Sequence, residues 1–411
     1  MTIKGALSNE SNISPRICHC YIFLEGWNRY IFFINTWIVI DLTGYATSAA
    51  ISLLIATLPS LFLSMIIGSM ADKYPAIKLV LYSECTRCLT LLVYASLFVM
   101  DRASPAFAYS VSFLMSICAE IQLLSWRVIL ATFATHEKNF KLNALSVTSG
   151  QAGVIIGATG SGMLFVTLGP TFTIAIASTI FWASSCCIAY MAKALHSPCA
   201  SAITKISTLN HLVAHLRSIL EGFQYITQQP RLIGYYLLIL LNTNILYMSN
   251  ALLAPFVKGP LNLNANAYGQ IDAAYSIGAI IGGLIIVKLT QRLGTLKITL
   301  LGLTTLALSL FIFAQSEAFL LAFFSYIGIG LGCQTSIVSL SHAQRITDPT
   351  LHGRAYATLN TLTGCFGVLI FILSTQFTSH EELRNMFEYQ AIAVTTVLLI
   401  IGASKKIKDS L

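Results

Sequence analysis

The sequence predicts an all-α membrane protein with twelve transmembrane helices, arranged as two pseudo-symmetric bundles of six. Its 411 residues are 56% hydrophobic and only 10% charged, whereas soluble domains average about 25% charged residues. Apolar segments long enough to cross about 30 Å of hydrocarbon recur along the whole chain. One long polar connection, residues 194–230, divides these segments into two groups of six. A soluble globule could not bury this much apolar surface, so lipid must be the solvent for most of the chain.

Turns and charged residues set the ends of the apolar segments. Gly169-Pro170 separates two of them, and Lys258-Gly259-Pro260 closes another. Segments of about 20–28 residues are too long for barrel strands, and helices satisfy their own backbone hydrogen bonds in lipid. The predicted spans are 19–42, 47–71, 77–100, 104–131, 143–167, 170–193, 231–257, 267–290, 296–316, 318–343, 354–378 and 384–403.

The basic residues predict the orientation of the chain. With a cytoplasmic N-terminus, seventeen Lys and Arg residues fall in inner loops and tails, and only Arg102, Lys258 and Arg384 fall in outer loops. Such a bias places both termini in the cytoplasm. We therefore expect a multi-pass protein of the cell (inner) membrane. The net charge of +8 then marks an inner-leaflet face and gives no reason to invoke nucleic acid.

The predicted domains follow from the two groups of spans. The end of the polar connection, "HLVAHLRSILEGFQYITQQP", places Leu212, Leu216, Leu220 and Phe223 at helical spacing. This pattern favours an amphipathic helix on the inner membrane surface, tethering the two halves. The domains are an N-terminal tail (1–18), a first six-helix bundle (19–193), a linker (194–230), a second bundle (231–403) and a C-terminal tail (404–411).

The ten cysteines do not predict a metal centre. Most of them lie in apolar runs, where cysteine acts as a small hydrophobe. Neither Cys18-His19-Cys20 nor the pair Cys85 and Cys88 has a second ligand pair at zinc spacing. We expect no metal and no cofactor.

The stretch "GSMADK" between the second and third spans resembles the G-x-L-A-D-R signature of the major facilitator superfamily. The resemblance implies that Gly68 allows close helix approach and that Asp72 contacts neighbouring helix ends on the cytoplasmic side. Lys73 lies beside this carboxylate, and Lys78 is the one further base nearby. These four residues would form a conformational latch, made in one transport state and broken in the other.

Other stretches resemble the drug and siderophore exporter branch of that superfamily, which contains the enterobactin and macrolide exporters. They are "VIDLTGYATSAA" (39–50), "LNALSVTSGQAGVIIGATGSG" (142–162), "LRSILEGFQYITQQPRLIGYYLL" (216–238) and "GRAYATLNTLTGCFG" (353–367). "GAIIGGLIIVKLTQRLGTLK" (278–297) stands in the second half where the latch stands in the first. The resemblance covers nearly the whole chain and implies the major facilitator fold with its internal repeats.

The fifth span carries five glycines, Gly150, Gly153, Gly157, Gly160 and Gly162. They would leave a smooth helix face for close packing. The run resembles the G-x-x-x-G-P-x-x-G-G signature of the antiporters in this superfamily, although it lacks the proline. That resemblance favours export by antiport, and tight packing alone would explain the glycines without any transport direction.

Ionisable residues within the spans are costly, so each needs a partner or a role. Glu25 and Arg29 lie four residues apart in the first span with Asn28 beside them, and Glu120 and Arg127 share one face of the fourth. Spans one and four line the central cavity in the resembled fold. Glu120 and Glu25 are therefore candidate proton-coupling groups, whereas Arg29, Arg127 and Asn28 would bind substrate or act as counter-ions.

Two further sets of charges receive different interpretations. Asp272 in the eighth span is a third proton-coupling candidate. Glu84 and Arg87 lie three residues apart near the inner surface, where a local ion pair is the favoured interpretation.

The sequence thus predicts a secondary transporter that exports a small amphiphilic or anionic molecule, a siderophore or a drug, by proton-coupled alternating access. Import of a ferric siderophore or metabolite and flipping of a lysophospholipid remain alternatives. No convergent nucleophile, acid or metal ligands indicate an enzyme, and no G-x-x-x-x-G-K-[ST] run indicates ATP as the energy source. The expected partners are the substrate and the lipid bilayer, and the expected assembly is a monomer.

Overall fold

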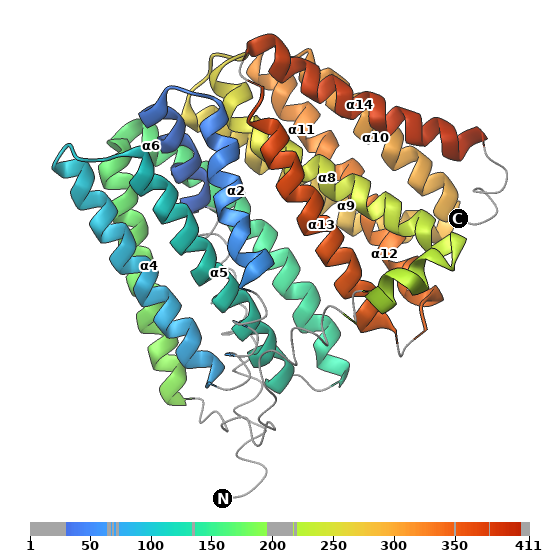
Figure 1. The fold of residues 1–411 in the computed structure, drawn as a ribbon, viewed down its shortest axis with the longest axis horizontal. Helices are drawn as coiled ribbons and strands as arrows, with labels where there is room; N and C mark the ends of the chain where they lie inside the picture. The colour runs from blue at the N-terminus through green and yellow to red at the C-terminus, as the bar shows by residue number, and fades with distance from the viewer. Residues whose placement is uncertain are drawn as a thin grey trace, which may run out of the picture. The chain divides into compact units, whose positions relative to one another are not determined.

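The computed structural model describes residues 30–63, 67, 70, 74–133, 136–194, 217, 220–348, 351–377 and 379–403. All regular secondary structure in these residues is helical (Figure 1). The all-α fold class predicted from composition is therefore confirmed. The chain divides into two compact units, Met1–Thr43 with Ile55–Lys205 and Gly44–Leu54 with Ile206–Leu411.

The first unit is built from apolar helices of different lengths. They are Tyr30–Thr43, α4 (Ala76–Val99), α5 (Pro105–Phe133) and α6 (His136–Ala194), and α2 (Thr47–Phe62) is divided between the units at Ile55. The backbone of α6 breaks at Gly169, where φ is 76° and ψ is 175°. Glycine adopts this backbone without a steric penalty, and Pro170 then restarts the helix at a position proline favours. The break lies at the predicted joint between the fifth and sixth spans.

The second unit contains seven of the labelled helices. They are α8 (Pro230–Lys258), α9 (Ala265–Leu293), α10 (Thr295–Ala314), α11 (Phe319–Cys333), α12 (Thr335–Ile346), α13 (His352–Ser374) and α14 (His380–Ala403). Helices α11 and α12 together form one candidate span, Phe319–Ile346.

Eight segments within the described residues are long and apolar enough to cross a membrane. One of these, Gly150–Ala189, contains two of the predicted spans. Helix α4 has the length of a span with 24 residues, and it carries the charged residues Glu84 and Arg87. Each of the twelve predicted spans overlaps a described helix, so the predicted count fits the structure.

Small residues set the close crossing of α9 and α11 in the second unit. A Cβ added at Gly278 of α9 would lie 1.9 Å from the carbonyl oxygen of Ile327. Conversely, a Cβ at Gly330 of α11 would lie 2.1 Å from the carbonyl oxygen of Tyr275. The two backbones are therefore in direct contact, a packing mode typical of membrane helices.

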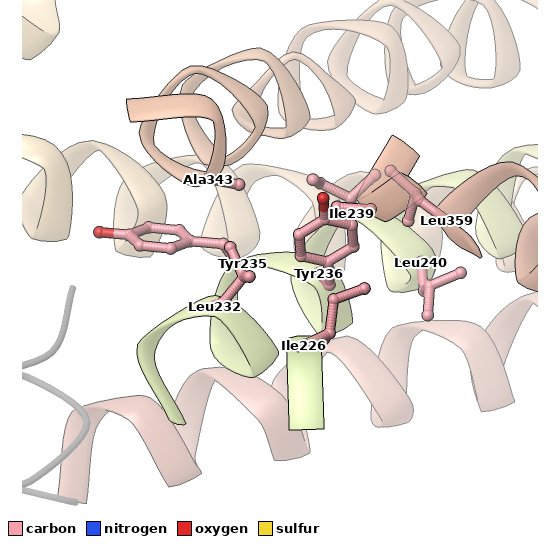
Figure 2. Packing of buried hydrophobic residues seen from close by; sticks show 9 residues of the cluster. Ile226, Leu232, Tyr235, Tyr236, Ile239, Leu240, Ala343 and Leu359 are labelled. Carbon is pink, nitrogen blue, oxygen red and sulfur yellow. The ribbon is translucent and has the colours of Figure 1, made fainter. Parts of the chain in front are cut away.

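The end of the linker, residues 220–227, is helical and packs against other helices of the second unit. Ile226 belongs to a buried cluster with residues of α8, α12 and α13 (Figure 2). The other members are Leu232, Tyr235, Tyr236, Ile239, Leu240, Ala343, Ala355 and Leu359. Gly222 touches α13, and the Tyr225 hydroxyl accepts a hydrogen bond from the Asp348 backbone N–H at 3.0 Å. Gly222 and Ile226 therefore form the packed face of this helix.

The predicted apolar stripe of the linker faces the other way. Leu220 and Phe223 are exposed, whereas Leu212 and Leu216 lie outside the described residues. The buried face could not be found from spacing because its key residue, Gly222, has no side chain. Contact between the exposed stripe and the membrane surface stays a prediction.

We expect Gly222→Val to detach the linker helix from α13. The new Cβ would lie 2.3 Å from the Thr358 hydroxyl and 2.5 Å from the Arg354 carbonyl oxygen. Overpacking of this kind costs about 1–3 kcal/mol, more than the roughly 0–1 kcal/mol expected from the partly exposed Glu221–Arg354 ion pair at 2.8 Å. Limited trypsin cleavage at Arg217 should become about tenfold faster.

The matched control is Gln224→Ala, an exposed position on the same helix. Its cleavage rate should equal that of the unmodified protein. Equal rates for Gly222→Val and Gln224→Ala would show that the packed face does not hold the linker.

Candidate functional site

Polar side chains anchor the first described helix inside the first unit. The amide nitrogen of Asn35 donates to the Ala108 carbonyl at 3.0 Å and to the Ser112 hydroxyl at 2.6 Å. Its amide oxygen accepts from the Tyr94 hydroxyl at 3.0 Å. The Tyr30 hydroxyl donates to the carbonyl of Thr173 at 3.2 Å. These buried bonds join the helix Tyr30–Thr43 to α4, α5 and α6, so it is positioned by polar contacts as well as by packing.

A charged cluster lies within the same unit. The Arg87 guanidinium donates from Nη1 to Glu84 Oε1 at 3.0 Å and to Gln122 Oε1 of α5 at 2.5 Å. Its carbon Cζ lies 5.4 Å from the centre of the Phe181 ring of α6. The exposed fraction of the Arg87 side chain is 1% and that of Glu84 is 0%. Helices α4, α5 and α6 are thus joined at a buried ion pair.

The local pairing of Glu84 with Arg87 predicted from the sequence is present, and its expected place near the inner membrane surface stays a prediction. The pair is buried because Gln122 and Phe181, which lie far away in the sequence, cover it. Glu84 Oε2 and Arg87 Nη2 have no hydrogen-bond partner among the described atoms. Spacing alone predicts the pair, and nothing in the local sequence signals that it is buried.

Glu120 and Arg127 both lie on α5, within or just beyond the candidate span Pro105–Trp126. Seven residues make about two turns, so both start from one face of the helix. Glu120 is half-buried. The side chain of Arg127 lies outside the described part of the structure, so a contact between the two stays a prediction.

Several predicted site residues lie outside the described residues. They are Glu25, Asn28 and Arg29 of the first span and Gly68, Asp72 and Lys73 of the proposed latch. Lys78 is described and is exposed in the first turn of α4. The latch therefore stays a prediction.

The five glycines of the fifth span all lie on α6, but they do not share one environment. Gly153, Gly157 and Gly162 are buried, whereas Gly150 and Gly160 are partly exposed. A Cβ added at Gly160 would meet no atom within 4 Å. Close packing at Gly160 was therefore a wrong expectation, because this position faces open space. Tight packing at the other four stays a prediction.

In the second unit, Asp272 is buried on α9, within the candidate span Ala265–Ile286. Two weak polar contacts join neighbouring helices. The Asn242 amide nitrogen of α8 lies 3.4 Å from the Thr335 hydroxyl of α12, and the Ser249 hydroxyl lies 3.4 Å from Gln390 Oε1 of α14. The interior of this unit is therefore not uniformly apolar. Asn242 and Gln390 were not singled out from the sequence, although amides in apolar runs are a usable signal.

Within the described part of the chain, no group of three His, Cys, Asp or Glu side chains could hold a metal ion. The cysteines described there are all free, including Cys85 and Cys88.

Comparisons with known proteins agree with this architecture. Residues 235–406 match the family model of the Major Facilitator Superfamily. The matched residues lie in the second unit. A Bacillus subtilis (strain 168) protein described as the uncharacterized MFS-type transporter YfmI is 26% identical over 166 residues. That alignment covers 40% of this chain and 39% of the relative.

Solved transporters have the same fold over nearly the whole chain. The nucleoside transporter NupG has a TM-score of 0.71 at 15% identity, covering 95% of this chain and 98% of NupG. A bacterial homologue of the iron transporter ferroportin, in an inward-facing state, has a TM-score of 0.74 at 14% identity, covering 95% and 97%. The peptide transporter POT has a TM-score of 0.72 at 13% identity, covering 96% of each chain. At such identities the likeness shows the major facilitator fold alone.

Proposed function

We propose that the protein is a secondary active transporter that exports a small amphiphilic or anionic molecule by proton-coupled alternating access. The fold supports transport, and each unit places an acidic residue within a candidate membrane span. This observation carries the proposal. Glu120 is half-buried on α5, and the exposed fraction of Asp272 on α9 is 3%. An acidic side chain within a membrane span is costly, so it needs a partner or a role. Proton transfer is a common role for such a residue.

The two ionisation states of such an acid give the coupling its physical basis. A protonated carboxyl group is neutral and is tolerated in a closed, dry interior, whereas the carboxylate favours a state open to water or to a cation. A proton that enters from outside and leaves to the cytoplasm would bias alternation in one direction. Substrate then moves outward as the proton moves inward.

The substrate class follows from the basic residues of the first and fourth predicted spans, which line the central cavity in the resembled fold. Arg29 and Arg127 keep their charge at any working pH, so they suit an anionic cargo or a counter-ion role. A carboxylate-bearing siderophore fits this chemistry, and a drug-like anion fits it as well. The helix-five glycines support antiport only by resemblance. Import of a ferric siderophore or metabolite, or lysophospholipid flipping, would use the same fold.

The cargo is tested by deleting the gene and measuring small iron chelators in the medium and in the cells under iron starvation. Loss from the medium with accumulation inside would support siderophore export. Unchanged secretion would exclude this cargo, and uptake and drug-resistance measurements would then decide between the alternatives.

Coupling is tested by Glu120→Gln, which we expect to abolish uphill transport because the amide cannot carry the proton. Proteoliposomes with an imposed pH gradient and a pH-sensitive dye would report proton flux on addition of the transported molecule. Asp272→Asn tests the second acid in the same way. Glu317→Gln, an exposed acid outside the candidate spans, is the matched control. Full uphill transport by Glu120→Gln would exclude Glu120 as the coupling group.

A further inference from the structure

An apolar groove lies in the second unit among α8, α13 and α14. Its volume is about 430 Å³, within the range of roughly 300–1,000 Å³ that is usual for small-molecule sites. The groove is lined by residues of all three helices, including Gly234, Leu238 and Leu241 of α8, Phe366 of α13, and Ile400 and Ile401 of α14. Leu237 and Ile400 at its edge are exposed, so the groove opens to the surroundings of the helices.

Gly234 keeps this groove open. A Cβ added at Gly234 would meet no atom within 4 Å, in contrast to Gly222 and Gly278, where backbone atoms already fill the space. Glycine within a helix costs about 1 kcal/mol relative to alanine, and neither close helix contact nor an unusual φ requires it here. The position is therefore explained by the space it leaves.

The walls and the length of the groove indicate that its occupant is a lipid acyl chain. Its walls belong to the candidate spans Pro230–Lys258, Arg354–Ser374 and His380–Ala403, and nearly all of its lining residues are apolar, so it suits a hydrocarbon chain. The lining runs along α8 from Gly234 to Asn244, which is about 15 Å at 1.5 Å per residue. This length is about half of the roughly 30 Å hydrocarbon core. The groove therefore has the depth of one leaflet.

The positively charged side chain of Arg231 lies near the end of the groove at the start of α8. Arg231 lies three residues before Gly234 and seven before Leu238, so all three share one face of α8. Arg231 is exposed in the first turn of the helix and makes no ion pair with a described residue. The N-terminal end of a helix also carries partial positive charge. The headgroup level above the groove is therefore electropositive.

We propose that this groove binds one acyl chain of an anionic phospholipid, with Arg231 contacting the headgroup. The acyl chain fills the space left by Gly234, between α8 and α14. The negative headgroup lies at the start of α8, at the membrane surface. This site is independent of the transported molecule and of the direction of transport.

Native mass spectrometry of the full chain, delipidated and titrated with phosphatidylglycerol or phosphatidylcholine, tests the proposal. The unmodified protein should retain one phosphatidylglycerol in preference to phosphatidylcholine. Gly234→Leu should lose this bound lipid because its side chain fills the groove. Arg231→Gln should keep a bound lipid but reduce the preference for phosphatidylglycerol about fivefold, the effect of one basic residue near a membrane surface.

The matched control is Gly283→Leu on α9, where a Cβ also meets no atom within 4 Å. It should bind phosphatidylglycerol as the unmodified protein does. If Gly234→Leu does not fold, Ile400→Phe narrows the groove from α14 at an exposed position and should weaken binding. Binding of both lipids to the same extent, or undiminished phosphatidylglycerol binding by the folded groove variants, would overturn the proposal.

Discussion

Gly278→Ala is expected to destabilise the second unit by about 1–3 kcal/mol, which is the usual cost of overpacking. The added methyl carbon would lie 1.9 Å from the Ile327 carbonyl oxygen and 2.9 Å from the Leu331 backbone nitrogen. Both atoms are backbone, so no side chain can rotate away and α9 and α11 must separate. The loss exceeds the gain of about 1 kcal/mol that alanine brings to a helix interior. Thermal unfolding in detergent should show a Tm lower by several degrees.

Gly283→Ala provides a control on the same helix with the same substitution. Because open space surrounds that position, alanine should be neutral or stabilising by about 0.5–1 kcal/mol. Gly330→Ala tests the reciprocal contact, 2.1 Å from the Tyr275 carbonyl oxygen, and should lower the Tm as Gly278→Ala does. If Gly278→Ala and Gly283→Ala unfold at the same temperature, the two helices do not cross in direct backbone contact.

The helix boundaries could be predicted from the sequence because bilayer thickness and turn chemistry act locally. The predicted span 231–257 differs by one residue at each end from α8, Pro230–Lys258. The joint at Gly169-Pro170 is where α6 breaks. Length, proline and positive-φ glycine leave few other places for an apolar helix to end.

The identity of the contacting glycines could not be predicted in the same way. Five glycines in the fifth span predicted a closely packed helix face, yet Gly160 faces open space. Gly278 and Gly282 have the four-residue spacing typical of close helix pairs, and a Cβ at either would approach α11 or the Gln334 side chain. A sequence shows the spacing on one helix, but the effect depends on which backbone lies opposite.

The same limit applies to charges. Glu84 and Arg87 are spaced for a local pair, and the same spacing occurs in exposed pairs and in pairs that are fully buried. What distinguishes them is Gln122, 35 residues from Arg87 and on another helix. The surroundings of the predicted proton-coupling acids could not be predicted from the sequence either. Asp272 is buried, but the sequence does not show which side chains of the neighbouring helices face it.

Arg87→Met is expected to have the largest effect among substitutions in the first unit. The variant leaves Glu84 buried without its cation and removes the hydrogen bond that Arg87 donates to Gln122. Removing one partner of a buried ion pair typically costs about 3–5 kcal/mol, because the remaining charge has lost both water and its partner. The contact with the Phe181 ring is lost as well. Thermal unfolding in detergent should show the largest fall in Tm for this variant.

The double variant Glu84→Met with Arg87→Met separates the cost of an unpaired charge from the value of the pair. Replacing both members by apolar residues of similar size is often neutral or stabilising. Two atoms of this pair already lack hydrogen-bond partners among the described residues, so little is lost when both charges go. The double variant should therefore recover most of the stability that Arg87→Met loses.

Arg102→Met, at an exposed arginine of the same unit, should change stability by less than about 0.5 kcal/mol. A double variant as unstable as Arg87→Met would show that the ion pair itself stabilises the packing of α4 against α5 and α6.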